Sequence, residues 1–242
     1  MLVDMQTRTD HIAAHDGTFD VHVWLPDSGS GPGILLVQEI YGVGPYIEKV
    51  AVDLASRGYV VAAPDLFWRL QPHWLGEHTP EGTQAAIELS QGFDLAHGVS
   101  DCALTVAHLS AMPEVSGSGG GRVGALGFCL GGSVDYMLAT QVELGAVLSF
   151  YGSAVPDATG LMERIQSPLL LVFGGSDPYI PRERVAAVEK AAEGRPNVVV
   201  HVEEEAGHAF HNSVSPMFHQ PEPAARAWEV AIAFLDEHLP VR

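Results

Sequence analysis

The amino-acid sequence predicts an α/β fold, in which helices cover both faces of a mainly parallel sheet. The first observation behind this prediction is a series of short, uninterrupted apolar runs, such as G-I-L-L-V at 33–37, which are typical of strands buried on both faces. The second is the alternation of these runs with helical patterns, which indicates βαβ units. Hydrophobic residues make up 47% of the 242 residues, enough to build a core around such a sheet.

The expected elements follow one another along the chain. Residues 19–25 alternate between apolar and polar, as a half-buried strand does, and the buried strand 33–37 follows. Pro45 suits the first turn of a helix that ends near Arg57, where Gly58 terminates it. The remaining strands are expected at 59–63, 122–126, 146–150, 169–173 and 198–202. The remaining helices are expected at 93–112, 133–139, 181–192 and 222–238.

Two connections differ from the short loops of this pattern. Residues 64–92 contain several aromatic residues and three prolines, and they are too long for an ordinary connection. Because loops at the carboxyl ends of parallel strands build sites, we expect an extended loop at about 64–92 that borders a pocket. The alternative is a segment that only covers the sheet edge.

A second loop, rich in Gly and Ser, occupies 116–121. With no internal repeat and no dividing linker, residues 1–242 are expected to form a single domain.

The charge balance and the cysteines narrow the possible partners. Lys and Arg total 12 and Asp and Glu total 30, so the formal charge of −18 disfavours nucleic acids and anionic membranes. No stretch approaches the ~20 apolar residues of a membrane span, and the N-terminus shows no signal peptide. Cys102 lies in a helical pattern and is expected to pack in the core, and it forms no C-x-x-C pair with Cys129. We therefore expect a cytoplasmic monomer or homodimer that acts on a small molecule and needs neither a metal nor a cofactor.

The segment G-F-C-L-G-G at 127–132 lies between a buried strand and a helical pattern. This is the strand–turn–helix context of a G-x-S-x-G nucleophile elbow, with Cys129 in the place of serine. Gly127 and Gly131 are needed because Cβ atoms on either side of the nucleophile would collide in so tight a turn. The N–H of Leu130 would then point toward whatever Cys129 attacks. A phosphate-binding turn is the alternative, but no Lys follows the glycines.

A free thiol has a pKa of about 8.5 and is mostly protonated at pH 7, so Cys129 needs a base. In hydrolases with this elbow, the chain order is nucleophile, acid, histidine. Asp177 leaves the carboxyl end of the strand 169–173, and His208 follows the last strand, so both are expected at the edge that holds Cys129. Alone, Asp177 is also typical of a turn or helix cap, and His208 is one of 12 histidines. Their order and placement together favour a Cys129–His208–Asp177 triad.

Four segments resemble the dienelactone hydrolase family of α/β-hydrolases, the carboxymethylenebutenolidases. These are Q-E-I-Y-G at 38–42, A-P-D-L-F-W-R at 63–69, G-F-C-L-G-G at 127–132 and A-G-H-A-F at 206–210, in the family order. The resemblance covers nearly the whole chain from Phe19 to the last helix, and it implies the α/β-hydrolase fold. It also implies hydrolysis of a lactone or a related small carboxylic ester through a cysteine thioester intermediate.

The resemblance implies roles for the residues of the triad and for two backbone groups beside it. Cys129 is the nucleophile, His208 is the general base and then the general acid, and Asp177 orients the histidine. The oxyanion hole uses the backbone N–H groups of Leu130 and Ile40.

The resemblance further implies that Glu39 is the family's extra carboxylate and that Arg69 is the receptor for a substrate carboxylate. A fixed negative charge beside Cys129 would disfavour the thiolate. Glu39 is therefore expected either to pair with Arg69 or to take the proton of the thiol itself. In the family scheme, a carboxylate-bearing substrate competes for Arg69 and frees Glu39 to activate the thiol. The aromatic residues Trp68 and Phe210 are expected to contact the substrate, with a position in the core as the alternative.

One position departs from the family pattern. Dienelactone-specific members carry a second arginine shortly after the catalytic histidine, where this sequence has Asn212. The departure removes a cation from the expected receptor for an acidic lactone. Three other functions stay open: a broader carboxylesterase or thioesterase with the same triad, a glutamine-amidotransferase-like cysteine enzyme that uses His201 and Glu203, and a non-catalytic ligand-binding protein on the same fold.

Overall fold

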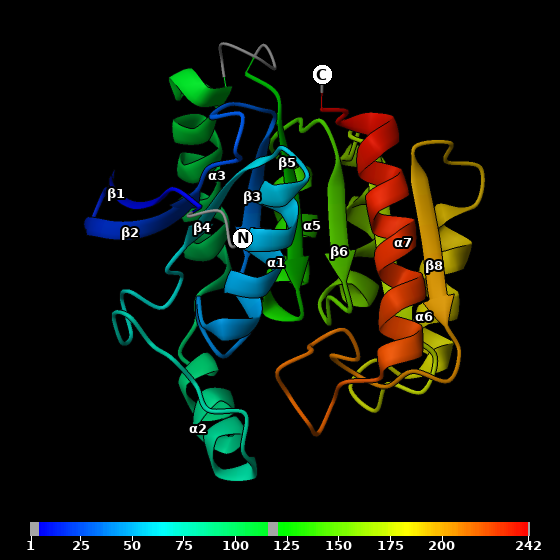
Figure 1. Ribbon diagram of the computed structural model, residues 1–242. Helices are drawn as coiled ribbons and strands as arrows, with labels where there is room; N and C mark the ends of the chain where they lie inside the picture. The colour runs from blue at the N-terminus through cyan, green and yellow to red at the C-terminus, as the bar shows by residue number, and fades with distance from the viewer. Residues whose placement is uncertain (1–4, 116–120, 242) are drawn as a thin grey trace.

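The computed structural model describes residues 5–115 and 121–241, and it contains an eight-stranded sheet (Figure 1). The strands are β1 (Thr7–Ala14), β2 (Gly17–Trp24), β3 (Gly33–Val37), β4 (Val60–Pro64), β5 (Val123–Phe128), β6 (Val147–Phe150), β7 (Leu169–Gly174) and β8 (Val198–Glu203). Their order is β1-β2-β4-β3-β5-β6-β7-β8. The pairs β1–β2 and β2–β4 are antiparallel, and all other neighbours are parallel. The predicted mainly parallel sheet is confirmed.

Helices cover both faces of this sheet. They are α1 (Pro45–Ser56), α2 (Pro80–Ser90), α3 (Leu95–Ala111), α5 (Leu130–Ala139), α6 (Arg182–Ala192), α7 (Pro221–His238) and the 3₁₀ helix η1 (Val155–Arg164). Figure 1 shows α1 and α7 on one face and α3, α5 and α6 on the other. Within the described ranges, no helix has the length and apolar character that a membrane crossing requires.

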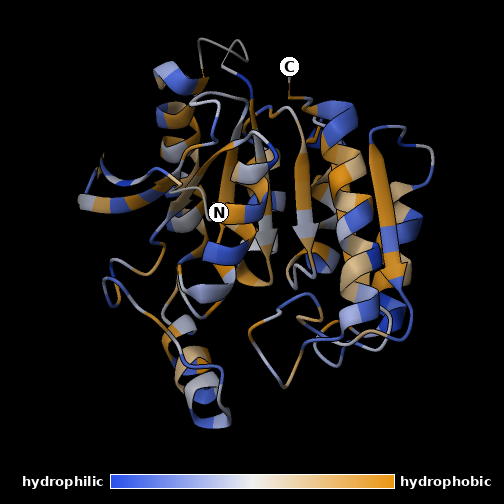
Figure 2. Cartoon of the chain, viewed as in Figure 1, coloured by the Kyte–Doolittle hydropathy of each residue, from blue (hydrophilic) through white to orange (hydrophobic). Residues whose placement is uncertain are grey.

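The core lies on both sides of the parallel strands. Every residue of β3, β4, β5, β6 and β7 is buried, as the continuous apolar runs predict. Figure 2 shows the same pattern, with hydrophobic strands inside and hydrophilic residues on the outer faces of the helices. Cys102, on α3, is fully buried, which confirms its predicted place in the core.

The structure adds two elements that the sequence pattern did not predict. Strand β1 pairs with β2 along its whole length, but only Ile12 among its residues is buried, so it carries almost no apolar signal. Helix α2 lies within the segment expected as an extended loop. The side chain of Thr79 caps it by accepting a hydrogen bond from the N–H of Gly82, and Pro80 occupies its first turn. Of the expected Gly/Ser loop, residues 116–120 lie outside the described part of the chain.

Parallel pairing brings the carboxyl ends of five neighbouring strands to one edge of the sheet. The segments that follow β3, β5, β7 and β8 all begin at this edge. They contain, in order, Glu39 with Ile40, then Cys129, Asp177 and His208. Residues almost 170 positions apart therefore meet at one place because the topology, rather than their spacing, brings them together.

Candidate active site

Cys129 lies at the turn between β5 and α5, in a backbone conformation that few side chains adopt. Its φ is 55° and its ψ is −109°, a strained region for a residue with a Cβ. A Cβ on Gly131 would lie 2.4 Å from the carbonyl oxygen of Val37, and a Cβ on Gly127 would lie 2.5 Å from the carbonyl of Gly131. Glycine at both positions lets the strand pass directly into the helix and holds Cys129 at the sheet edge.

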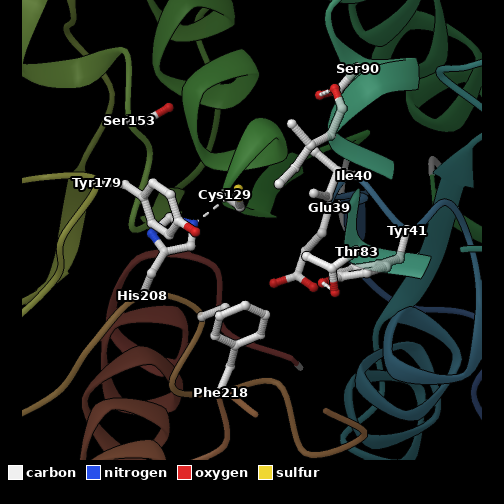
Figure 3. A pocket seen from close by; sticks show the side chains of 12 residues that line it. Glu39, Ile40, Tyr41, Thr83, Ser90, Cys129, Ser153, Tyr179, His208 and Phe218 are labelled. Atoms are coloured by element: carbon white, nitrogen blue, oxygen red, sulfur yellow. Dashed lines mark hydrogen bonds between the residues drawn. The ribbon is translucent and has the colours of Figure 1, made fainter. Parts of the chain in front are cut away.

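His208 connects Cys129 to Asp177. Its Nε2 lies 3.1 Å from the Sγ of Cys129, a contact drawn in Figure 3, and its Nδ1 lies 2.6 Å from the Oδ2 of Asp177. The Oδ1 of Asp177 accepts hydrogen bonds from the N–H groups of Tyr179 at 2.7 Å and Ile180 at 3.2 Å, which hold the carboxylate in place. The Nδ1 proton therefore faces Asp177, and Nε2 can exchange a proton with the thiol.

The surroundings of His208 favour a charged imidazolium. Burial by itself opposes the charge, but the Cys129 sulfur and the Asp177 carboxylate outweigh burial and raise the pKa of His208 well above its ordinary value. So basic an imidazole can take the proton of an adjacent thiol. The geometry therefore suits a thiolate–imidazolium pair, the form in which a cysteine is nucleophilic.

A cavity of about 250 Å³ lies against the Cys129 sulfur. Its walls come from the loops at the sheet edge, from α2 and from the segment before α7 (Figure 3). The lining residues are Glu39, Ile40, Tyr41, Thr83, Ile87, Ser90, Cys129, Ser153, Tyr179, His208, Ala209 and Phe218. Neither Lys nor Arg is among these described residues, and the walls are mostly apolar. In the described part of the chain, no cluster of His, Cys, Asp and Glu is placed to hold a metal ion.

Two backbone N–H groups at this site have no hydrogen-bond acceptor within the described ranges. Leu130 begins α5 directly after Cys129, and Ile40 follows β3 and lines the cavity. Unpaired N–H groups at a helix N-terminus and beside a cavity are suited to stabilise a developing negative charge. Both groups expected for the oxyanion hole are therefore available to a bound molecule.

Glu39 also lines the cavity, but its partner is not the expected one. The residue is 2% exposed, and its Oε2 accepts a hydrogen bond from the amide of Asn212 at 2.7 Å. Burial raises the pKa of Glu39 to about 7, against the lowering effects of His208, Asn212 and Tyr151. The pair with Arg69, one of the two expected arrangements, is therefore wrong. A neutral amide holds this carboxyl group in place of a guanidinium.

Arg69 is bound to two other carboxylates. Its Nε and Nη2 donate to Asp16 at 2.6 and 2.9 Å, and its Nη1 and Nη2 donate to Asp101 at 2.6 and 3.1 Å. The guanidinium also stacks on Trp68, 4.1 Å from the ring centroid. Arg69 is absent from the described residues that line the cavity, so the structure does not place it where a receptor for a substrate carboxylate is expected.

The two aromatic residues expected at the substrate pack within the protein. Trp68 donates from Nε1 to Asp101 at 2.9 Å and stacks on Phe19, with 6.0 Å between the ring centroids. Phe210 is fully buried and packs edge-on against Tyr151, at 5.6 Å between centroids. Neither is among the described residues of the cavity wall: Phe210 lies in the core, and Trp68 is partly buried against it.

Several residues of the cavity wall belong to no motif, so the sequence did not predict them as site residues. They are Thr83, Ile87 and Ser90 on α2, with Tyr41, Ser153, Tyr179 and Phe218 in loops. A helix start at Thr79 followed by Pro80 was the one signal available for α2. Asn212 was noted only for the arginine it replaces, because nothing in the sequence indicates that it contacts Glu39.

His201, the histidine of the glutamine-amidotransferase-like alternative, lies on β8 and points elsewhere. Its Nε2 is 2.9 Å from Glu203, whose carboxylate also accepts from Arg226 at 2.6 Å. The histidine that reaches Cys129 is His208. The geometry therefore disfavours the amidotransferase-like arrangement.

The family of the chain follows from comparison with known proteins. Residues 19–239 match the dienelactone hydrolase family. The chain belongs to this family. Carboxymethylenebutenolidase from Pseudomonas sp. (strain P51) is 30% identical to it, over 93% of this chain and 92% of the relative. Carboxymethylenebutenolidase 1 from Cupriavidus pinatubonensis is 29% identical, over 84% of this chain and 86% of the relative. The resemblance seen in the motifs is confirmed, and the protein is a dienelactone hydrolase-like hydrolase.

Solved structures share the fold over nearly the whole chain. A dienelactone hydrolase-like promiscuous phosphotriesterase from metagenomic libraries superposes with a TM-score of 0.80 at 24% identity, covering 97% of this chain and 98% of the other. Dienelactone hydrolase from Anabaena variabilis superposes with a TM-score of 0.70 at 18% identity, covering 98% of this chain and 100% of the other. These likenesses confirm the predicted α/β-hydrolase fold.

Proposed function

We propose that the protein hydrolyses a lactone or a small carboxylic ester through a thioester on Cys129. The observation that supports this most is the hydrogen-bonded series Cys129–His208–Asp177 beside a cavity of about 250 Å³. The carboxymethylenebutenolidases among its relatives support the lactone. The mostly apolar walls suit a small acyl group.

The first half of the reaction forms the thioester. The sulfur of Cys129 attacks the carbonyl carbon, a C–S bond forms, and negative charge moves to the carbonyl oxygen. The N–H groups of Leu130 and Ile40 donate hydrogen bonds to that oxygen. The C–O bond then breaks, and the Nε2 of His208 gives its proton to the leaving oxygen. An ester releases an alcohol, whereas a lactone keeps the new hydroxyl on the acyl chain.

The second half of the reaction consumes water. The neutral His208 takes a proton from a water molecule, whose oxygen attacks the thioester carbonyl. The C–S bond breaks, the carboxylic acid leaves, and Cys129 remains as a thiolate beside an imidazolium, which is the starting pair. Asp177 accepts a hydrogen bond from the Nδ1–H of His208 throughout and stabilises the imidazolium whenever it forms.

A burst experiment with 4-nitrophenyl acetate tests this function. Because acylation releases nitrophenolate before water attacks, we expect a burst of about one equivalent per protein molecule, with an acetyl group on Cys129 in the intact mass. Cys129→Ala is expected to abolish the burst and the adduct. Cys102→Ala is the matched control, because Cys102 is fully buried on α3 and its loss should leave the burst in place.

Two outcomes would contradict the proposal. A burst that survives in Cys129→Ala would exclude the thioester, and the absence of any acylation across esters and lactones would favour the non-catalytic ligand-binding alternative. Values of kcat/KM across lactones, esters and thioesters separate the lactone hydrolase from the broader esterase. A preference of about tenfold or more for lactones is expected, which corresponds to about 1.4 kcal/mol in the transition state.

A further inference from the structure

The loop around Asn212 fixes how Glu39 is hydrogen-bonded. Asn212 is fully buried, and its Oδ1 accepts hydrogen bonds from the N–H groups of Val214 and Ser215, both at 3.1 Å. These two donors settle which end of the amide is oxygen, because Oδ1 must face them. The Nδ2 group therefore faces Glu39, and it donates to Oε2 at 2.7 Å.

This contact decides which oxygen of a neutral Glu39 carries the proton. Oε2 receives the Asn212 hydrogen bond, and the carbonyl oxygen of a carboxylic acid is its better acceptor, so the proton belongs on Oε1. Oε1 has no hydrogen-bond partner among the described residues. Figure 3 shows the carboxyl group of Glu39 directed into the space between His208 and Thr83. A buried donor without an acceptor is costly, and a bound molecule with an oxygen would satisfy it.

Burial favours the neutral acid of Glu39 over the carboxylate, and the groups around it oppose burial only in part. Asn212 offers no charge, and the charge of His208 is already shared with Cys129 and Asp177. The other titratable groups that face Glu39 are the phenols Tyr41, Tyr46 and Tyr151. The Tyr151 hydroxyl lowers the pKa of Glu39 as a polar neighbour, although neither this hydroxyl nor Oε1 has a partner in hydrogen-bond geometry in the described ranges. Burial then raises the pKa of Glu39 to about 7.

We propose that Glu39, held by Asn212, is a fixed hydrogen-bond donor that binds an oxygen of an uncharged acyl substrate. The inference rests on the proposed function of the same cavity and names its substrate class: neutral lactones and esters that carry no carboxylate. The carbonyl or ring oxygen of the substrate accepts from Oε1–H. A carboxylate would lose its water in a cavity whose described walls contain no Lys or Arg, next to the Cys129 sulfur.

Two nitrophenyl esters of matched shape test the substrate class. In 4-nitrophenyl 4-methylpentanoate, an isopropyl group stands where mono-4-nitrophenyl succinate has its carboxylate. We expect kcat/KM for the neutral ester to exceed that for the charged ester by about 100-fold or more, because burying an unpaired carboxylate is unfavourable. Ser90→Arg places a cation on the cavity wall and is expected to lower this preference about tenfold. Ser90→Gln, which is uncharged, is expected to keep the preference within about threefold of the wild-type value.

The pH profile of Glu39→Gln tests the role of the carboxyl group. The amide oxygen can accept from Asn212 while its Nε2 takes the place of the protonated Oε1 as a donor. As pH rises through about 7, wild-type protein loses this donor and the variant does not. The ratio of kcat/KM at pH 8.5 to that at pH 6 is therefore expected to be about tenfold larger in the variant.

The outcomes separate this inference from the proposed function. A loss of about 100-fold or more at every pH in Glu39→Gln would make Glu39 the base for the thiol and overturn the inference. So would a preference of wild-type protein for the charged ester, if Cys129→Ala still abolishes turnover. Hydrolysis of neither ester would overturn the proposed function as well.

Discussion

Replacement of Arg69 by methionine is expected to change stability rather than substrate preference. Arg69→Met removes both hydrogen bonds from the guanidinium to Asp101, whose side chain is 1% exposed, and leaves that carboxylate with one donor, the indole of Trp68. Removing one partner of a buried ion pair costs about 3–5 kcal/mol. Because Arg69 itself is 19% exposed, we expect the lower end, about 3 kcal/mol. The exposed Asp16 adds little, because solvent screens its ion pair with Arg69.

Urea unfolding at pH 7 measures the predicted loss of stability. The ratio of kcat/KM for the two matched nitrophenyl esters measures whether the substrate preference stays the same. Arg57→Met is the control, because Arg57 follows the last residue of α1 and pairs with Asp53 while both side chains are about 40% exposed, so its loss should cost about 0.5 kcal/mol or less. In a double-mutant cycle, Arg69→Met and Asp101→Asn are expected to couple by about 2 kcal/mol, since each removes the same contact.

The opposite result would restore the family's substrate receptor. If Arg69→Met unfolds within about 0.5 kcal/mol of wild type and selectively loses turnover of the charged ester, Arg69 leaves its two carboxylates to bind substrate. That result would refute a purely structural role for Arg69.

Three further predictions concern the turn, the triad and a buried acid. Asp177→Asn removes the charge that stabilises the His208 imidazolium, so kcat is expected to fall by about a thousandfold or more in ester assays; a loss below about tenfold would contradict the orienting role. Gly131→Ala places a Cβ 2.4 Å from a backbone oxygen of β3, and we expect about 3 kcal/mol of destabilisation in urea and loss of the nitrophenolate burst; a normal burst would show that the turn relaxes. Burial raises the pKa of Asp135 well above its ordinary value of 3.8, so the folded protein keeps a proton that the unfolded chain releases above that pH. Asp135 therefore contributes less to stability as pH rises above that value, by up to about 1.4 kcal/mol per pH unit. Asp135→Asn should remove this contribution, so that its stability falls less steeply above about pH 4 than that of the wild-type protein, whereas exposed Glu143→Gln should leave the slope as it is. An unchanged slope in Asp135→Asn would show that the acid is ionised or hydrated.

The parallel part of the fold was predictable because its strands are buried on both faces. A run such as 33–37 is typical of such a strand, and Gly127 and Gly131 mark the turn that follows β5. Strand β1 was not predictable, because at the sheet edge its stability comes from backbone hydrogen bonds, which leave no side-chain pattern. Helix α2 buries only Thr83 and Ala86, so its apolar stripe is too narrow to be recognised.

The site likewise contains residues that the sequence predicts and residues whose contacts it does not predict. Cys129 and the glycines beside it were predictable, because a tight turn imposes its own local sequence. The contacts of Arg69 were not, because Asp16 comes from the turn after β1 and Asp101 from α3, and only the folded arrangement brings them to the guanidinium. Phe210 shows a related limit. An aromatic residue next to a catalytic motif has the same sequence signature whether it faces the cavity or the core.

The charges at the site explain why an amide next to Glu39 matters. When Cys129 is a thiolate and His208 an imidazolium, their charges cancel. The carboxylate of Asp177 then gives the triad a net charge of −1. An ionised Glu39 would add a second, with no cation among the described cavity residues. A guanidinium at position 212 would donate a hydrogen bond and also neutralise that charge, whereas the amide of Asn212 only donates. Burial raises the pKa of Glu39 to about 7, and the amide at 212 opposes this less than a guanidinium would. The residue at 212 therefore shifts the balance between an acid that binds a substrate oxygen and a carboxylate that repels an anion. A single loop position can in this way change the substrate class while the chemistry of the thiol stays the same.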